Sequence, residues 1–231
     1  MDNTRDNMRN GAYNQIKYRI IHFEYVPGQK ISEKTISTEL DLGRTPVREA
    51  LIRIEREELI EVIPQSGTYI TKIDLQEAQD GRYVRESIEP RIMLQAATMM
   101  TEAACQKIQS NLNEQQKTAV ANEPDDFFDL DQDFHHAFYS LTGKDTVWQW
   151  LQMNNTQLNR FRRLRLKEAE LDWDMLLKQH QRIYEAVLDK DIDNINYFMM
   201  EHLHLMLEEK NKVIGAYSDY FKNEETEEEI K

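Results

Sequence analysis

The sequence predicts a mainly α-helical protein with two folded parts, a short N-terminal part that ends in a β-hairpin and a longer all-helical antiparallel bundle. Turn-forming residues gather early, because four of the seven glycines and three of the five prolines precede residue 74. After that point, apolar residues recur at helical spacing with few interruptions. The run Asp74-Leu75-Gln76-Glu77 resembles a capping box that opens a helix. We therefore expect domains over residues 1–73 and 74–222, followed by an acidic tail over 223–231.

The N-terminal part is expected to contain three helices and a hairpin. Ala12, Ile16 and Ile20 lie four residues apart and form one apolar helical face. Pro46 falls in the first turn of the third helix, where its missing N–H is harmless. The predicted elements are helices over residues 10–24, 33–40 and 44–57, and strands over 60–63 and 68–71 joined by Pro64-Gln65-Ser66-Gly67. This order of elements is that of a winged helix-turn-helix, which binds DNA.

The third predicted helix carries the residue types that DNA contacts require. Arg44, Thr45 and Arg48 lie at its N-terminus, the end that enters the major groove in this motif, and they point away from its apolar face. Arginine suits a bidentate contact to guanine or a phosphate, and threonine suits a phosphate. Gln65 and Ser66 at the hairpin tip could contact the minor groove or adjacent phosphates. On spacing alone, a helical surface with solvated arginines is the alternative to DNA binding.

Charge and composition limit the other classes of protein. The net charge of −13 opposes DNA binding, but residues 1–73 hold 11 acidic and 11 basic side chains, so the whole excess lies beyond them. The apolar runs are too short to span a bilayer, and the polar N-terminus does not resemble a secretory signal. The single cysteine, Cys105, excludes an internal disulfide. These features predict a cytoplasmic protein that does not bind membranes.

Four residues of the bundle could bind a divalent metal ion. Asp131 and His135 are four residues apart, so both side chains leave the same face of one helix. His180 and His202 lie in two other helical stretches. One carboxylate and three imidazoles suit zinc, nickel or manganese, and they leave coordination positions for water or an organic acid. The alternative is that these histidines lie at the surface or in an ordinary core.

Three segments of the N-terminal part form a specific motif. They are Pro27-Gly28-Gln29-Lys30-Ile31, then Gly43-Arg44-Thr45-Pro46-Val47-Arg48-Glu49-Ala50-Leu51, and then Glu58-Leu59-Ile60 with Pro64 and Gly67-Thr68. With these residues the part resembles the GntR family of bacterial regulators. The resemblance implies DNA contacts at Lys34, Arg44, Thr45, Arg48 and Gly67. The family usually has Ser or Thr where Gly43 stands, so one hydroxyl contact to phosphate is expected to be lost.

Sparser motifs occur in the bundle. They are Arg85-Glu86-Ser87-Ile88-Glu89-Pro90, Asp131-Gln132-Asp133-Phe134-His135, His180 with Ile183 and Ala186, and Met200-Glu201-His202-Leu203. Together they resemble the all-helical FCD effector domain of the FadR-like branch of the same family. The resemblance implies a metal site at the four positions named above. It also implies effector binding at Arg85, whose guanidinium could pair with a carboxylate. An ion pair between Arg85 and Glu89 is the alternative.

Two further predictions concern other side chains of the bundle. The arginines of one basic run are expected to form a solvated or interface face rather than a second DNA site: Arg160, Arg162, Arg163 and Arg165. Trp148 and Trp150, with Leu151, are expected to pack inside the bundle.

The sequence thus predicts a DNA-binding transcriptional regulator, a repressor rather than an enzyme, that binds a pseudo-palindromic operator as a homodimer. A small organic-acid effector, possessing a carboxylate and bound at or near the metal, is expected to modulate operator binding. Two alternatives for the C-terminal bundle remain open. It is either a structural dimerisation module without an effector, or a metal-dependent hydrolase.

Overall fold

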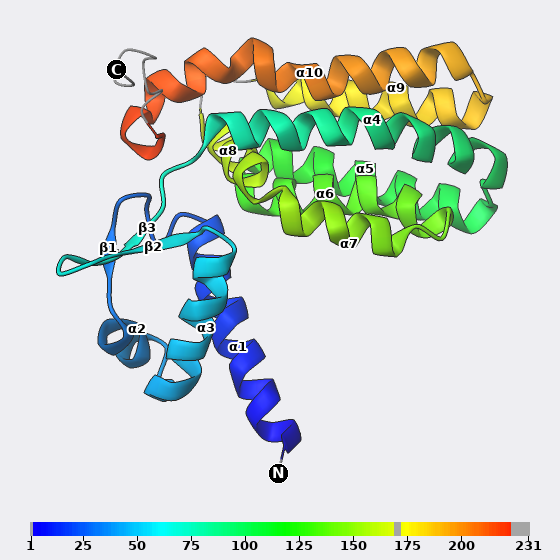
Figure 1. Ribbon diagram of the computed structural model, residues 1–231. Coiled ribbons are helices and arrows are strands. Elements are labelled where there is room, and N and C mark those ends of the chain that lie inside the picture. Colours follow the sequence, from blue (N-terminus) through cyan, green and yellow to red (C-terminus); the bar gives the residue numbers. More distant parts are fainter. Residues whose placement is uncertain (1, 169–171, 223–231) are drawn as a thin grey trace. The chain divides into compact units, whose positions relative to one another are not determined.

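The computed structural model describes residues 2–168 and 172–222, and over these residues the protein is mainly helical (Figure 1). The chain divides into two compact units. Of the described residues, the first unit contains those up to Asp74 together with those from Tyr217 to Lys222, and the second runs from Leu75 to Ala216. The expected fold class, a small sheet among helices followed by a helical bundle, is confirmed. The expected acidic tail, 223–231, lies outside the described residues. Among those residues, no helix is both long and apolar enough to cross a membrane.

The first unit has the predicted order of helices and strands. Its elements are α1 (Asp2–Ile21), β1 (Lys30–Ile31), α2 (Glu33–Glu39), α3 (Arg44–Arg56), β2 (Ile60–Ile63) and β3 (Gly67–Ile70). Helix α1 ends at Ile21 rather than near residue 24, because Phe23 adopts a left-handed backbone conformation with a φ of 62° that a right-handed helix cannot include. The sequence pattern does not reveal β1, because a strand of two residues shows no alternation of polar and apolar side chains.

The three strands form one antiparallel sheet in the order β1-β3-β2. In its register, Tyr69 of β3 lies opposite Lys30 on one side and Glu61 on the other. The hairpin formed by β2 and β3 is the predicted wing. Gly67 opens β3 with a φ of 144°, a conformation that residues with a side chain rarely adopt.

Helices α1, α2 and α3 pack with the sheet around a shared apolar core. Ile16 and Ile20 of α1 are fully buried, as are Val47 and Ile54 of α3. Burial of each such side chain stabilises the fold by about 1.5–3 kcal/mol. The apolar faces predicted for the two helices are therefore confirmed, and the opposite face of α3 stays exposed.

The chain returns to the first unit after the bundle. Residues Tyr217–Lys222, which we name the terminal segment, contain a short 3-10 helix, η1 (Ser218–Tyr220). The N–H of Ile73 donates a hydrogen bond of 2.8 Å to the carbonyl of Tyr220, and the N–H of Lys222 donates one of 3.0 Å to the carbonyl of Ile73. The terminal segment is therefore paired with the stretch of chain that leads into the bundle.

This return differs from the expected limits of the second domain. The local sequence pattern predicts a bundle over residues 74–222, whereas the terminal segment groups with the first unit. The physical reason is that Phe221 is only 3% exposed and that Lys222 Nζ lies 2.9 Å from Asp74 Oδ2. Neither contact follows from local sequence, because the partners are far apart along the chain.

The second unit consists of helices over its described residues. They are α4 (Leu75–Met99), α5 (Glu102–Ala121), α6 (Pro124–Leu141), α7 (Asp145–Asn154), α8 (Thr156–Lys167), α9 (Trp173–Asp189) and α10 (Ile192–Ala216). Helix α4 begins directly after Asp74, as the capping pattern predicts. It packs against α6, α8, α9 and α10, and Figure 1 shows it running along the middle of the bundle with α10 on one side and α6 on the other.

The tryptophans of α7 follow the prediction only in part. Trp148 and Leu151 are buried, but Trp150 is 59% exposed. Trp150 stands two residues from Trp148, and a helix turns about 100° per residue, so the two side chains leave opposite sides of α7.

Gly81 allows α4 and α8 to approach closely. A Cβ atom at this position would lie 2.7 Å from Oδ1 of Asn155 and 3.5 Å from Cβ of Leu158. Both of these residues are buried, so neither side chain can swing freely into solvent. The close approach matters for the site described below, because α4 and α8 both contribute residues to it.

We expect Gly81→Ala to lower the free energy of unfolding by about 1–2 kcal/mol. The added methyl overpacks the contact with Asn155, and this cost exceeds the gain in helix propensity. Gly215 of α10 is the matched control, because no atom lies within 4 Å of a Cβ built there. Gly215→Ala should raise the free energy of unfolding by about 0.5–1 kcal/mol. Urea denaturation followed by circular dichroism measures both changes, and equal changes in the two variants would contradict a tight α4–α8 contact.

Candidate metal centre and nucleic-acid interface

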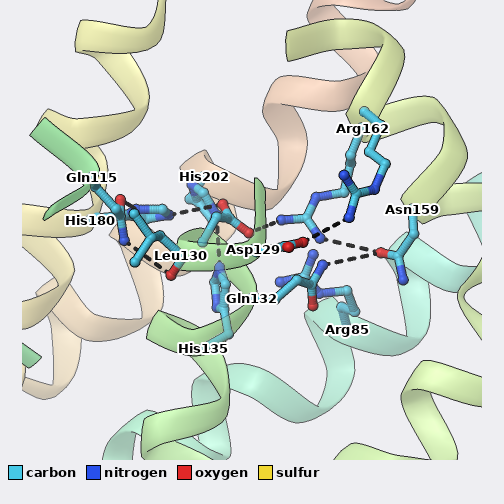
Figure 2. Close-up of polar contacts among 12 residues, drawn as sticks. Arg85, Gln115, Asp129, Leu130, Gln132, His135, Asn159, Arg162, His180 and His202 are labelled. Carbon is cyan, nitrogen blue, oxygen red and sulfur yellow. Dashed lines mark hydrogen bonds and ion pairs between the residues drawn. The ribbon is translucent and has the colours of Figure 1, made fainter. Parts of the chain in front are cut away.

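Four side chains from three helices converge inside the second unit. Helix α6 supplies Asp131 and His135, α9 supplies His180, and α10 supplies His202. One ligand atom of each lies within 4.8 Å of the others, and all four residues are buried. Figure 2 shows the three histidines grouped together. These are the residues that the sequence assigns to a metal site, and we name them the four-residue cluster.

Aromatic packing fixes the position of the cluster. Phe134 and Phe138 lie on the buried side of α6 together with His135 and are fully buried themselves. The ring of Phe134 stacks on the ring of His180, with 4.4 Å between the ring centroids. Helix α6 begins at Pro124, a residue that suits the first turn of a helix. The polar ligands are thus held by an apolar core around them.

Each imidazole has an acceptor beside its Nδ1 atom. The three pairs are His135 Nδ1 with Glu89 Oε2 at 3.0 Å, His180 Nδ1 with Gln115 Oε1 at 2.8 Å, and His202 Nδ1 with Gln179 Oε1 at 3.1 Å. A hydrogen-bond acceptor at Nδ1 selects the tautomer in which that nitrogen carries the proton, so Nε2 of His180 and Nε2 of His202 each keep a free lone pair. Nδ1 of His135 lies near Glu89 but makes no hydrogen bond within the described part of the chain.

The Nε2 atoms face the interior of the cluster. Nε2 of His202 lies 3.3 Å from Nε2 of His135, and Nε2 of His180 lies 3.4 Å from Asp131 Oδ1. Nε2 of His180 has no hydrogen-bond partner within the described part of the chain. A proton or a cation between Nε2 of His202 and Nε2 of His135 would satisfy both atoms. The orphaned nitrogen and the donor set therefore fit a divalent transition metal.

The surroundings favour the neutral form of His180 and His202 and the charged form of Asp131. Desolvation lowers the pKa of His180, and desolvation together with the neighbouring imidazoles lowers the pKa of His202 well below its usual value. Burial alone would raise the pKa of Asp131, but the charge of Arg162 outweighs it and holds that pKa well below its usual range. Neutral imidazole and ionised carboxylate are the forms that bind metal ions.

Two arginines flank the four-residue cluster (Figure 2). Arg85 donates to the carboxylate of Glu89 through Nε at 2.6 Å and through Nη2 at 3.2 Å, and both residues are buried. The ion pair that the sequence offers as the alternative role of Arg85 is therefore present. Burial would raise the pKa of Glu89, but the charge of Arg85 outweighs it and lowers this pKa to about 2. Arg162 donates through Nη2 to Oδ2 of Asp131.

The basic run of α8 is largely buried, which corrects the expectation of a solvated or interface face. Arg160, Arg163 and Arg165 are all buried, and Arg162 is half-buried. The acidic partners lie on other helices: Asp125 and Asp129 of α6 for Arg163, Asp131 of α6 for Arg162, and Glu209 of α10 for Arg165. The spacing of residues within α8 does not reveal these partners. Without knowledge of the partners, a run of arginines suggests a solvated face, because arginine is seldom buried unless it is paired.

A small cavity lies beside the four-residue cluster. About 40 Å³ of it is open to the centres of water molecules, which is enough for about three of them. Its polar wall consists of Arg82, Arg85, Asp131, Arg162, Arg165 and His202. The rest of the wall is apolar and includes Leu158 and Leu203. The cavity therefore joins cationic groups, two residues of the cluster and an apolar lining.

In the first unit, α3 presents the expected DNA-contacting residues to solvent. Arg44 and Thr45 are exposed in its first turn, and Gly43 caps the helix without a side-chain hydrogen bond. Arg48 is exposed and donates to the carboxylate of Glu33 at 2.8 and 3.0 Å. An exposed ion pair of this kind contributes little to stability, so Arg48 can exchange Glu33 for an anionic ligand at small cost.

The helix α2 and the wing contain the remaining predicted positions. Lys34 is exposed on α2, and Gln65 and Ser66 are exposed at the tip of the wing. A Cβ atom on Gly67 would lie 2.6 Å from Cε of Lys30, so the glycine leaves room for that lysine. Lys30 is a cation beside the wing that the sequence analysis does not single out.

The sequence pattern also misses the residues that hold the histidines in place. Gln115 of α5 and Gln179 of α9 are buried, although glutamine is usually exposed. Gln115 additionally donates from Nε2 to the carbonyl of Leu130 at 3.4 Å. Of the three acceptors near the histidine rings, Glu89 alone belongs to a sequence motif, the one that also contains Arg85.

Comparison with protein families gives two matches. Residues 8–70 match the family described as bacterial regulatory proteins, gntR family. Residues 82–205 match the FCD domain. The first match covers most of the winged helix-turn-helix, and the second contains the whole four-residue cluster.

Individual relatives agree with the family matches. The HTH-type transcriptional repressor RspR of Escherichia coli (strain K12) is 31% identical over 212 residues, which cover 92% of each chain. The Uxu operon transcriptional regulator of the same organism is 26% identical and covers 81% of this chain and 80% of its own. Among solved structures, E. coli McbR/YncC has a TM-score of 0.75 at 16% identity and covers 91% of this chain and 98% of its own. This last similarity supports the fold.

The buried pair of Arg85 and Glu89 gives a prediction for stability. Glu89→Gln leaves a buried guanidinium without its counter-charge, and we expect a loss of about 3–5 kcal/mol in the free energy of unfolding. The matched control is Glu201→Gln, because Glu201 pairs with Arg182 at 3.0 Å while both side chains are more than a third exposed. That variant should lose less than about 1 kcal/mol. Urea denaturation of metal-free protein measures both, and similar losses would mean that the Arg85–Glu89 pair is not buried in solution.

Proposed function

Because the chain belongs to the GntR family of bacterial regulatory proteins and carries an FCD domain, we propose that it is a transcriptional repressor whose operator binding responds to a small organic acid held beside a metal ion. As a member of that family, the protein is a transcriptional regulator. The observation that carries the finer proposal is the buried convergence of the four-residue cluster in a chain that also exposes a recognition helix. The similarity to a relative named as a repressor supports the direction of regulation.

In this proposal, α3 enters the major groove of the operator. Arg44 and Arg48 contact base edges or phosphates, and Thr45 contacts a phosphate. The backbone of the DNA next to the groove is contacted by residues of α2 and the wing: Lys34, Gln65, Ser66 and Gly67. One recognition helix contacts only a few base pairs, so a homodimer on a pseudo-palindromic operator supplies the second half of the site.

A surface groove of the second unit supports the homodimer. It lies between α4 and α7, and its apolar lining includes Val84, Ile88, Val147 and Trp150. Val84 and Trp150 are exposed in the single chain. Contiguous exposed apolar side chains, aromatic ones above all, are typical of contacts between proteins. A second copy of the chain is the occupant that we assign to this groove.

The four-residue cluster would hold the metal through Asp131 and the Nε2 atoms of its three histidines. Glu89, Gln115 and Gln179 would keep the rings in the orientation and tautomer that binding requires. Zinc, nickel and manganese all suit such a donor set. The metal, when bound, supplies a Lewis-acidic centre that can hold a carboxylate.

The cavity next to the cluster supports a binding site for the effector. Arg85 lines that cavity while its guanidinium stays paired with Glu89, so it can contact a carboxylate without leaving its partner. The small volume favours a small acid over a large one. Regulation is favoured over hydrolysis, because the relatives described above are named as transcriptional regulators.

Chain connectivity offers a route from the effector to the DNA-binding unit. Helix α10 carries His202 and leads into the terminal segment, which is hydrogen-bonded to Ile73. Helix α4 carries Arg85 and starts at Leu75, two residues after Ile73. A shift of α4 or α10 on effector binding would therefore reach the first unit through two stretches of chain that are bonded to each other. Such a shift requires different affinities of the effector for the two states.

The recognition helix gives a prediction for DNA binding. Arg44→Ala is expected to weaken operator binding by about 1–3 kcal/mol if the side chain contacts a base, and Arg48→Ala should weaken it as well. Arg91→Ala is the matched control, because Arg91 is exposed on α4 of the second unit and its loss changes the net charge equally. Affinities come from fluorescence anisotropy with operator DNA at fixed salt. Unchanged affinity in both α3 variants would show that this helix does not contact the operator.

The cluster gives a prediction for metal binding. Protein purified without chelators or a metal-affinity tag should contain about one divalent ion per chain, measured by inductively coupled plasma mass spectrometry. His180→Ala should abolish this binding, and Gln115→Ala should weaken it about 10–100-fold because the His180 ring loses its acceptor. His136→Ala is the control, because its ring pairs with Asp145 at 3.0 Å and is 38% exposed. If the wild-type chain neither contains metal nor gains thermal stability from zinc, nickel or manganese, the structural dimerisation module becomes the better interpretation.

A further inference from the structure

The cavity beside the four-residue cluster contains more arginines than a single carboxylate requires. Its lining includes Arg82, Arg85, Arg162 and Arg165. Each is paired with one carboxylate, and these partners are Glu86, Glu89, Asp131 and Glu209 in the same order. The formal charges of the four pairs therefore cancel. A divalent cation in the cluster would leave two positive charges in excess, and uncompensated charge is costly in a buried site.

Two of the four arginines have hydrogen-bond donors without acceptors. Nε of Arg82 and Nη2 of Arg165 are buried and have no hydrogen-bond partner among the residues that the structure describes. The side chain of Arg165 is 6% exposed, so bulk water does not reach it freely. Arg85, by contrast, uses both Nε and Nη2 on Glu89. A buried donor left unpaired costs free energy, so the two orphaned donors mark where an acceptor is missing.

We infer that the effector is a short dianion, with one carboxylate on the side of Asp131 and His202 and a second carboxylate that accepts hydrogen bonds from Arg82 and Arg165. The inference rests on the proposed function, because the bound metal ion sets the excess charge that the dianion cancels. Charge-assisted hydrogen bonds from guanidinium groups to a carboxylate are about twice as strong as hydrogen bonds between neutral groups.

The size of the cavity limits the length of this dianion. Room for about three water molecules suits a dicarboxylate with a short carbon chain, such as malonate or succinate. The apolar wall, which includes Leu158 and Leu203, can pack against the carbon atoms between the two carboxylates. A long-chain acid would require the wall to open.

Isothermal titration calorimetry of the full-length, zinc-loaded protein tests the inference with succinate and with butyrate, which has the same number of carbon atoms but one carboxylate. Wild-type protein should bind succinate about tenfold or more tightly than butyrate, the effect of about one charge-assisted hydrogen bond. Arg82→Gln should remove most of this preference while zinc affinity and butyrate affinity stay unchanged. The double variant Arg165→Gln with Glu209→Gln should do the same, and it leaves no unpaired buried carboxylate.

The matched control is Arg163→Gln, which also removes a buried guanidinium of α8. Arg163 pairs with Asp125 and Asp129 at 2.7 Å each and does not line the cavity, so its variant should keep the preference for succinate. Circular dichroism shows whether each variant is folded. If Arg82→Gln does not fold, the succinate preference of the double variant tests the inference instead. Equal binding of succinate and butyrate by zinc-loaded wild-type protein would overturn this inference and leave the proposed function standing. A wild-type chain that binds neither zinc nor either acid would overturn both.

Discussion

Three imidazoles whose ring nitrogens face one another inside an apolar bundle form the constraint on which the second unit depends. Each ring has an acceptor atom near its Nδ1, and these acceptors belong to the buried residues Glu89, Gln115 and Gln179. A buried Glu89 in turn needs a counter-charge, which Arg85 supplies. The cluster therefore requires buried polar residues on α4, α5 and α9, at interior positions that apolar residues usually occupy.

The same constraint explains why the arginines of α8 are buried. Asp131 must stay ionised to serve as a ligand, and Arg162 provides the positive charge beside it. Further along α8, Arg165 reaches Glu209 of α10, the helix that also carries His202. Helix α8 thus ties Asp131 of α6 to the helix that leads out of the bundle. Buried pairs of this kind contribute little net stability but are strongly destabilising when one partner is lost, so they fix the arrangement of the helices.

A feature of the fold or of the candidate site could be predicted where residues close together in the sequence determine it. Arg44, Thr45 and Arg48 stand in one dense motif on one helix, and the apolar spacing of Val47 and Ile54 fixes which way they point. Asp131 and His135 share a face for the same local reason. Gln115 and Gln179 carry no such signal, because their partners lie 65 and 23 residues away.

Two departures from prediction have the same cause. The basic run of α8 suggests a solvated face when its acidic partners on α6 and α10 are unknown, since an arginine is buried only when it is paired. The terminal segment suggests a continuation of the bundle when its pairing with Ile73 is unknown. In both cases a contact between distant parts of the chain overrides the local pattern. Trp150 differs, because the turn of α7 alone separates it from Trp148.

The Arg165–Glu209 pair shows how an anion in the cavity could alter α10. An effector carboxylate that accepts from Nη2 of Arg165 shares the guanidinium with Glu209, because Nε of Arg165 is the atom that donates to Glu209. Such a bond would change how the guanidinium links α8 to α10. To turn a 1:99 population of two states into 99:1, a ligand needs about 5.5 kcal/mol of differential affinity. Hydrogen bonds to charged groups contribute about 1.5–3 kcal/mol each, so two to four of them made in one state alone are sufficient. Because α10 continues into the terminal segment and that segment is bonded to Ile73, a movement of α10 would act on the stretch of chain that joins the two units.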